Sequence, residues 1–168
     1  EKHSYQANPW SWLVMGRPTS FFYETPKNCG TDHCSQEVLA LGTPILWWLA
    51  TIAVAVVIGY WIRSFAVKRY EPPLNVIVTG IAAGYLPWFF FQKRTVFSFY
   101  AIVFEPFLIL AIIYCAYVAL MHFENKRNTY VVLGLIGFVI FINFIFFLPL
   151  YTGQVITYDS WQARMWLP

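Results

Sequence analysis

Four long apolar runs restrict this chain to very few folds. They are Leu41–Ile62, Leu74–Phe91, Thr95–Met121 and Thr129–Leu150, and only Glu105 carries a charge within them. As a helix, even the shortest run covers roughly 27 Å, which is enough for the hydrocarbon core of a bilayer. Only helices and closed barrels span a bilayer, and these runs are too long and too uniformly apolar for barrel strands. We therefore predict an all-α membrane protein with four transmembrane helices.

The overall composition agrees with this interpretation. The chain has 168 residues, of which 59% are hydrophobic and 11% are charged, whereas soluble domains carry about 25% charged residues. The formal net charge of +3 is too small to indicate a nucleic-acid partner. The positions of the cations matter more than their sum, and membrane lipid is the expected partner.

Residues 1–40 have the composition of a membrane interface, because aromatic and proline residues dominate them. The prolines exclude one long helix, so we expect a short helix near Ser11–Gly16 and a turn or strand near Thr19–Glu24. This gives three parts: an extracytoplasmic segment (1–40), a four-helix transmembrane module (41–150) and an extracytoplasmic tail (151–168). Because the chain starts without Met or a signal peptide, we expect a fragment or a C-terminal module of a longer protein.

The orientation follows from the Lys and Arg residues near the helix ends. Loops 63–73 and 122–128 hold five of them, and the turn 92–94 together with the tail holds three. Cytoplasmic loops carry the excess of positive charge. We therefore predict that the two loops are cytoplasmic, and that both termini and the turn 92–94 are extracytoplasmic.

Cys29 and Cys34 are close together in the segment assigned to the outside. Outside the cytoplasm, such a pair usually forms a disulfide. The alternative is a metal site, because His33 adjoins Cys34, but zinc needs about four ligands and a second cluster is missing from the sequence. We expect the disulfide and no metal. Cys115 lies alone inside the third run and is expected to be a small apolar filler.

Two neighbouring cations, Lys93 and Arg94, lie between the second and third runs with almost no loop around them. Cations at helix ends often only anchor the helix at the headgroups. The functional interpretation is phosphate binding, because arginine offers a rigid fork that matches phosphate and lysine adds a point charge. Both cations lie on the side where positive charge is disfavoured. We interpret this turn as the polar edge of a lipid-phosphate site.

If the third helix is continuous, Arg94, Ser98, Ala101 and Glu105 share one face, which should contact protein rather than lipid. Arg94 and Glu105 would then be roughly 16 Å apart along the axis, too far for a salt bridge. For Glu105 we expect a neutral carboxylic acid that is hydrogen-bonded within the bundle. One carboxylate without a visible second is weak evidence for acid–base chemistry.

Further candidate contacts are aromatic. Pro87 should kink the end of the second helix, and Tyr85 and Trp88 would then lie at the outer interface. In the first segment, Trp10, Trp12 and Arg17 could hold a sugar, a lipid headgroup or an acceptor, although plain interfacial anchoring explains them equally well.

Asn143, the strongly polar residue of the fourth run, is expected to connect helices. The sequence contains no HExxH, no Gly-rich phosphate loop, no Ser/His/Asp series and no paired carboxylates. It therefore lacks a complete set of catalytic residues, and we assign none.

Three groups of motifs resemble a known family. The first is SYQANPWSWLVMGRP (residues 4–18), followed by Phe22-Tyr23-Glu24. The second is Tyr85-Leu86-Pro87-Trp88, followed by Arg94, Phe97 and Tyr100. The third is Cys29 with Cys34-Ser35-Gln36, and then Leu41-Gly42-Thr43-Pro44. Together they resemble the C-terminal four-helix region of the protein O-mannosyltransferases, and the third group is similar to the actinobacterial branch.

The resemblance implies a membrane glycosyltransferase of the GT-C type, in the plasma membrane of a bacterium. Such an enzyme moves mannose from a polyprenyl-phosphate donor to Ser or Thr of a secreted protein. It implies no cofactor in this chain, and it implies an N-terminal catalytic part that carries the family's acidic pair. Arg94 falls at the family's arginine position, and Tyr100 is a candidate contact. The chain departs from the eukaryotic His-Tyr pair, because it has Ser98-Phe99-Tyr100 there, with Glu105-Pro106 further on.

A second hypothesis is a non-enzymatic membrane subunit, such as a transporter or an assembly module. Transporters usually show repeats, or broken helices with several polar groups near the midplane. Here only Glu105 and Asn143 are candidates for such groups, which weakens this alternative.

Overall fold

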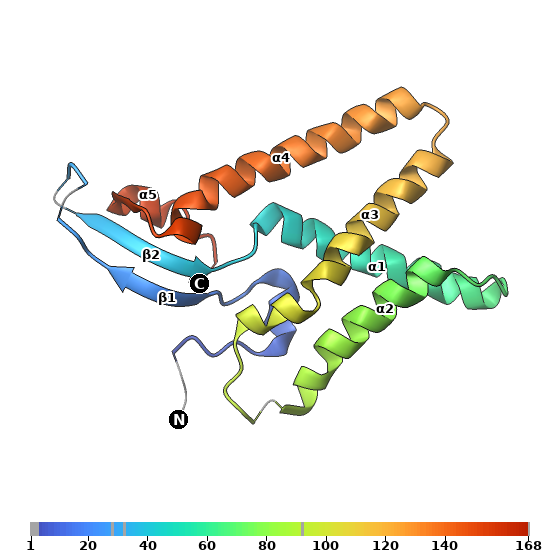
Figure 1. Ribbon diagram of the computed structural model, residues 1–168, viewed down its shortest axis with the longest axis horizontal. Coiled ribbons are helices and arrows are strands. Elements are labelled where there is room, and N and C mark those ends of the chain that lie inside the picture. Colours follow the sequence, from blue (N-terminus) through green and yellow to red (C-terminus); the bar gives the residue numbers. More distant parts are fainter. Residues whose placement is uncertain (1–3, 28, 32, 92, 168) are drawn as a thin grey trace.

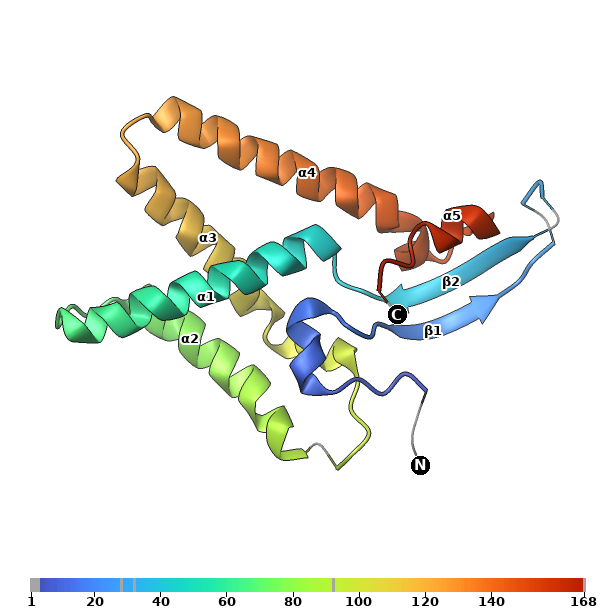
Figure 2. The ribbon, with the colours of Figure 1, turned by 180° about the vertical axis from the view of Figure 1, so that it is seen from behind.

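The computed structural model describes residues 4–27, 29–31, 33–91 and 93–167. The described part is mostly helical, and its four long helices confirm the predicted membrane spans. They are α1 (Pro44–Ala66), α2 (Pro72–Tyr85), α3 (Glu105–His122) and α4 (Lys126–Thr152). With its extension to Phe91, α2 joins the other three as long and apolar enough to cross a membrane. The α1–α2 and α3–α4 loops lie at one end, and both termini lie at the other (Figures 1 and 2).

The second span changes from α-helix to 3-10 helix near its C-terminal end. α2 ends at Tyr85, and a 3-10 helix, η2 (Leu86–Phe91), continues the span. Proline has no N–H for the helical ladder and its ring clashes with the preceding turn. The change of helix type at Leu86 and Pro87 therefore agrees with the break predicted at this proline.

The third span starts later than the sequence predicted. α3 begins at Glu105, not Thr95, and Pro106 occupies its first turn, where the missing N–H of proline costs nothing. Phe97 before it is extended, and the 3-10 helix η3 (Ser98–Val103) lies between. The predicted helical face that joined Arg94 to Glu105 is therefore wrong, because the two residues do not share a helix.

Close backbone approach holds the first three helices together. Most residues of the main core cluster come from α1, α2, α3 and the segment before α3. A Cβ atom on Gly80 would lie 2.2 Å from the Phe107 ring, and one on Gly84 would lie 2.9 Å from Cβ of Phe104. Glycine at these two positions lets α2 pack directly against the start of α3, where Phe104 is fully buried.

The N-terminal segment and the tail form a small antiparallel sheet at the end of the molecule where both termini lie (Figure 1). Its strands, in spatial order, are β1 (Thr19–Glu24), β2 (Cys34–Ala40) and β3 (Val155–Thr157). The predicted strand is β1, and the predicted short helix is a 3-10 turn, η1 (Pro9–Val14). β2 and β3 were not predicted. Because β3 pairs with β2, the tail is not separate from the first segment.

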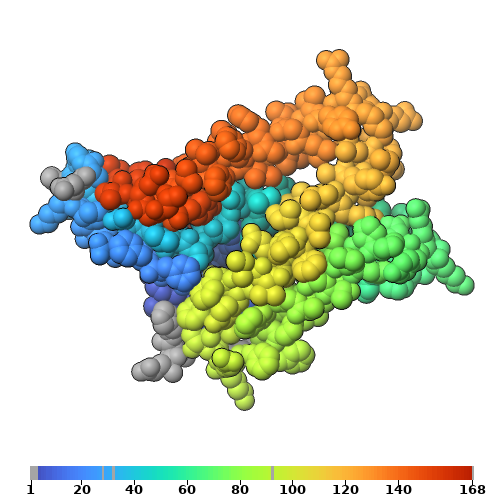
Figure 3. Space-filling view, viewed as in Figure 1, coloured from blue at the N-terminus to red at the C-terminus, as the bar shows by residue number. Residues whose placement is uncertain are grey.

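α4 is the least buried of the four spans. Its buried residues are Thr129, Asn143, Phe147 and Leu150, and it forms one edge of the space-filling view (Figure 3). Oδ1 of Asn143 accepts a hydrogen bond from the Ile45 N–H, 3.0 Å away, in the first turn of α1. The predicted role of Asn143 in connecting helices is confirmed.

Candidate functional site

Lys93 and Arg94 lie in the turn that follows η2. The segment between α2 and α3 that contains this turn lies toward the end of the molecule that holds the termini (Figures 1 and 2). The Arg94 N–H donates to the Phe91 carbonyl oxygen over 2.9 Å, which closes the turn. Both residues are exposed. Within the described ranges, no salt bridge or side-chain hydrogen bond involves either cation. The turn therefore presents two adjacent positive charges that the described residues do not neutralise.

Four of the six predicted contact residues form one aromatic cluster: Trp12, Tyr85, Trp88 and Tyr100. They come from η1, α2, η2 and η3 in turn. The Trp88 and Tyr100 rings are stacked, with centroids 4.7 Å apart and planes at 9°. The Trp12 ring lies 5.6 Å from Trp88, 6.3 Å from Tyr100 and 6.4 Å from Tyr85.

The polar atoms of this cluster bind the chain's own carbonyls. Nε1 of Trp12 donates to the Ala7 oxygen over 3.0 Å, and the Tyr85 hydroxyl donates to the Pro9 oxygen over 2.8 Å. Trp12 and Tyr85 are also buried, so they hold the N-terminal segment in place. Trp88 and Tyr100 are only half-buried and keep part of their ring surface open.

The other two predicted residues lie outside the aromatic cluster. Trp10 is 72% exposed, and its ring meets the Phe89 ring edge-on at 4.7 Å. Arg17 is exposed, and its Nη1 lies 3.5 Å from the Gln6 carbonyl oxygen, a long hydrogen bond. Both remain available at the surface.

A pocket of about 210 Å³ lies against the buried side of the aromatic cluster. We call it the Glu105 pocket. It is lined by η1, the β2–α1 junction, α1, η3 and the first residue of α3: Trp12, Met15, Ala40, Leu41, Gly42, Trp47, Ser98, Phe99, Ala101, Ile102 and Glu105. Glu105 is half-buried there. Among the described residues its carboxylate has no hydrogen-bond or ion-pair partner, so the expected hydrogen bond within the bundle is not found.

The sequence reasoning missed this pocket because it placed Ser98 and Glu105 on one continuous helix. The available signal was Glu105-Pro106, since an acid followed by proline is typical of the first turn of a helix. Starting the helix there brings Glu105 next to the β2–α1 junction.

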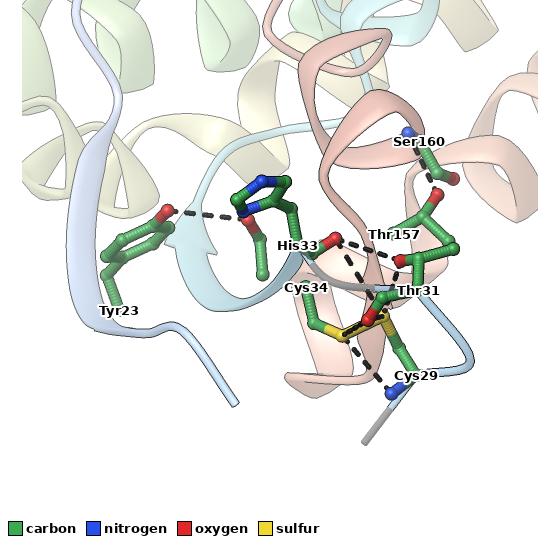
Figure 4. The surroundings of a disulfide bond; sticks show 8 residues. Tyr23, Cys29, Thr31, His33, Cys34, Thr157 and Ser160 are labelled. Carbon is green, nitrogen blue, oxygen red and sulfur yellow. Dashed lines mark hydrogen bonds between the residues drawn. A yellow bond between two sulfur atoms is a disulfide. The ribbon is translucent and has the colours of Figure 1, made fainter. Parts of the chain in front are cut away.

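Cys29 and Cys34 form a disulfide in the structure, with their Cα atoms 5.8 Å apart (Figure 4). Around it, the Thr31 hydroxyl donates to the His33 carbonyl oxygen over 3.1 Å, and Tyr23 and Ser35 pair their hydroxyls at 3.3 Å. The described residues contain no group of three or more His, Cys, Asp or Glu side chains that could hold a metal ion.

Arg164, the cation of the tail, is fully engaged by the protein. Its Nε donates to the Phe146 oxygen over 2.6 Å, and its Nη1 donates to the backbone oxygen and the hydroxyl of Ser160. The guanidinium carbon also lies 4.5 Å from the centroid of the Phe146 ring. Burial lowers the pKa of this arginine from its ordinary value. Arg164 therefore fastens the tail to α4.

Comparison with known proteins gives consistent matches. A family model described as the C-terminal four TMM region of protein-O-mannosyltransferase matches residues 1–168. The polyprenol-phosphate-mannose–protein mannosyltransferase of Mycolicibacterium smegmatis is 30% identical over 99% of this chain and 32% of that protein. The Corynebacterium glutamicum protein of the same name is 33% identical, with the same coverage. The chain thus spans about a third of the length of these relatives.

A solved structure shares the fold. The S. cerevisiae protein O-mannosyltransferase Pmt1-Pmt2 complex bound to the sugar donor matches with a TM-score of 0.75 and 22% identity. The match covers 99% of this chain and 24% of that chain.

Proposed function

Because this chain belongs to the protein O-mannosyltransferase family, as its C-terminal four-helix region, we propose that it is the membrane module of a bacterial protein mannosyltransferase. The complete enzyme would transfer mannose from a polyprenyl-phosphate donor to Ser or Thr of secreted proteins. The names of the actinobacterial relatives support this donor and a protein acceptor. The catalytic acidic residues would belong to the N-terminal part of the same enzyme.

The observation that carries the proposal is the turn with Lys93 and Arg94. Charged side chains at membrane depth usually have partners, and the described residues supply none here. A phosphate at the interface would satisfy both cations, since arginine can hold it with two parallel N–H···O bonds. The module would thus bind the donor through its lipid phosphate.

The open aromatic surface would complete this environment. Trp88 and Tyr100 present half-buried rings next to the turn, and Trp10 and Arg17 remain exposed on the N-terminal segment. Aromatic side chains of this kind suit the headgroup region of a bilayer. We assign them to contacts with the lipid, the sugar or the acceptor protein.

This function requires the outer end of the module to face away from the cytoplasm. The count of cations near the helix ends supports that orientation. It places residues 1–40, the turn 92–94 and the tail 151–168 on the extracytoplasmic side. Labelling of introduced cysteines in intact cells tests it, and labelling of loop 122–128 from outside would contradict it.

The proposal is tested by binding of polyprenyl-phosphate-mannose to the complete enzyme in lipid. Arg94→Ala should weaken binding by roughly ten- to a hundred-fold, because a charge-assisted hydrogen bond contributes about 1.5–3 kcal/mol. Arg94→Lys should recover only part, because it keeps the charge and loses the fork. Lys93→Ala should have a smaller effect than Arg94→Ala.

The matched control is Arg127→Ala, which removes an exposed arginine at the opposite end of the bundle. It should leave donor affinity and mannosyl transfer unchanged. Wild-type affinity and turnover in a normally folded Arg94→Ala enzyme would refute the phosphate role and leave only interfacial anchoring.

A further inference from the structure

We propose that the Glu105 pocket binds a sugar ring through its hydroxyl groups. This inference rests on the proposed function, because a mannosyltransferase must hold the mannose as well as the lipid phosphate. It assigns a role to a carboxylate that the phosphate site does not use. It also divides recognition of one substrate class between two places, Arg94 for the phosphate and Glu105 for the sugar.

Glu105 differs from the other poorly exposed carboxylates among the described residues. Glu37 is buried, and it accepts a hydrogen bond from Nε1 of Trp161 over 2.6 Å. Glu71 accepts one from the Tyr114 hydroxyl over 2.8 Å and pairs with Arg69 at 3.4 Å. Glu105 is half-buried and has no such partner in the described part of the chain. A polar group in this position is costly unless something binds it.

The pocket's composition limits the ligand. Glu105 is the one charged residue among those that line it, and a carboxylate only accepts hydrogen bonds when ionised. A phosphate would be repelled here, whereas a neutral group with several hydroxyl donors would be held. The Ser98 hydroxyl, half-buried on the same wall, can both donate and accept.

The aromatic walls suit the apolar faces of a sugar ring, where its C–H groups lie. Nε1 of Trp47 donates to the Trp12 oxygen over 2.9 Å, and Nε1 of Trp12 donates to the Ala7 oxygen. Both indole N–H groups are therefore occupied by the backbone, so these residues offer the pocket apolar ring surface. An acidic anchor beside apolar rings matches a ligand with hydroxyl groups on its rim and C–H groups on its faces.

The pocket also lies where a donor sugar could reach it. Trp12 belongs both to the aromatic cluster and to the pocket wall. After the Arg94 turn, a short segment leads into η3, which ends just before α3. η3 supplies several of the residues that line the pocket. η1 and η3 lie side by side at the outer end in both ribbon views (Figures 1 and 2). The turn and the pocket are therefore connected through η3 and the aromatic cluster.

Gly42 limits the size of the pocket. A Cβ atom at this position would lie 2.6 Å from the Trp47 ring and 3.2 Å from the Met15 sulfur. Gly42→Ala should therefore move the Trp47 ring and change the pocket's shape without altering any charge. It provides a steric variant to set beside the Glu105 variants.

The experiment compares two ligands on the complete enzyme: polyprenyl-phosphate-mannose and the sugar-free polyprenyl phosphate. Glu105→Ala should weaken binding of the mannose-bearing lipid by about tenfold or more, and it should leave the sugar-free lipid unaffected. Glu105→Gln, which keeps one acceptor oxygen, should fall between Glu105→Ala and wild type. Glu124→Ala, an exposed acid at the other end of the bundle, is the control and should change neither.

Arg94→Ala distinguishes this inference from the proposed function, because it should weaken both lipids equally. The sugar could also come from an already mannosylated acceptor. In that case, Glu105→Ala would weaken binding of a mannosylated peptide while both lipids bind normally, and the pocket would still be a sugar site.

The ratio of the two lipid affinities is measured on the same sample, so partial misfolding does not affect it. An unchanged ratio in Glu105→Ala and Glu105→Gln, together with unchanged binding of the mannosylated peptide, would overturn the proposal. Glu105 would then be the partner of a basic side chain elsewhere in the enzyme.

Discussion

The tail around Arg164 and the turn around Arg94 both lie at the end of the molecule that holds the termini, and each contains an arginine close to a long apolar helix. In the tail, three hydrogen bonds and the Phe146 ring occupy the guanidinium. In the turn, the described residues leave it exposed and without a partner. The two arginines therefore differ in their surroundings. Arg164 holds the tail against α4, whereas the Arg94 side chain is exposed and open to a ligand.

The opposite end of the molecule, which holds the α1–α2 and α3–α4 loops, supports the same distinction. Arg69 pairs with Glu71, and Nζ of Lys126 donates to the Leu120 and Phe123 carbonyl oxygens at the end of α3. Cations at the end of a helix stabilise its free carbonyl groups. The Arg94 turn follows a 3-10 helix and has no such interaction in the described ranges, which is why we assign it to binding.

The largest effect on stability is expected from Arg164→Ala. It leaves the Phe146 and Ser160 carbonyl oxygens without their charged donor, so it should lower the free energy of unfolding by about 2–3 kcal/mol. Arg94→Ala should change it by less than about 0.5 kcal/mol. Thermal unfolding of the complete enzyme in detergent measures both. Equal destabilisation by the two variants would contradict the claim that Arg164 stabilises the fold and Arg94 does not.

A smaller effect is expected from replacing Cys29 and Cys34 with serine. The disulfide closes a short loop, so its loss should cost about 2 kcal/mol, mostly in the β1–β2 hairpin. Hydrogen exchange should increase in β2 while donor affinity stays at the wild-type value. Mass spectrometry without reductant provides the check on the bond itself. Two free thiols or a bound zinc ion would contradict this account of the outer segment.

The smallest effect is expected from Asn143→Ala, which removes the link between α4 and α1. Hydrogen bonds between membrane helices contribute about 0.6 kcal/mol on average, so the unfolding midpoint should fall only slightly. Asn128→Ala, an exposed asparagine on the same helix, is the control. If both variants unfold like the wild type, α4 is held by its apolar contacts and the Arg164 interactions alone.

The sequence predicted the four spans because long uncharged apolar runs have few alternatives. It misplaced the start of the third span because hydropathy does not distinguish an α-helix from an extended stretch followed by a 3-10 turn. Residues 95–103 are as apolar as a membrane-spanning helix, and only Pro106 indicated where α3 begins. That error also led to the wrong face shared by Arg94 and Glu105.

The sheet was harder to predict. In β2 the buried residues are Cys34, Ser35, Glu37 and Leu39. Two of these four are polar, which hides the alternating apolar pattern of a strand. Ser35 is paired with Tyr23 on the neighbouring strand β1, and Glu37 is paired with Trp161 from the distant tail. No local pattern in the sequence shows such partners. The Glu105 pocket was missed because of the misplaced third span and because its walls come from three separate stretches of the chain, residues 12–15, 40–47 and 98–105.

The central claim is that Arg94 binds the lipid phosphate of the donor, and the most direct measurement is a structure of the complete enzyme with polyprenyl-phosphate-mannose bound. The account predicts a phosphate oxygen about 2.7–2.9 Å from a guanidinium nitrogen of Arg94, the distance of a charge-assisted hydrogen bond. A donor phosphate held elsewhere, with the Arg94 side chain in solvent or among bulk lipid headgroups, would contradict it.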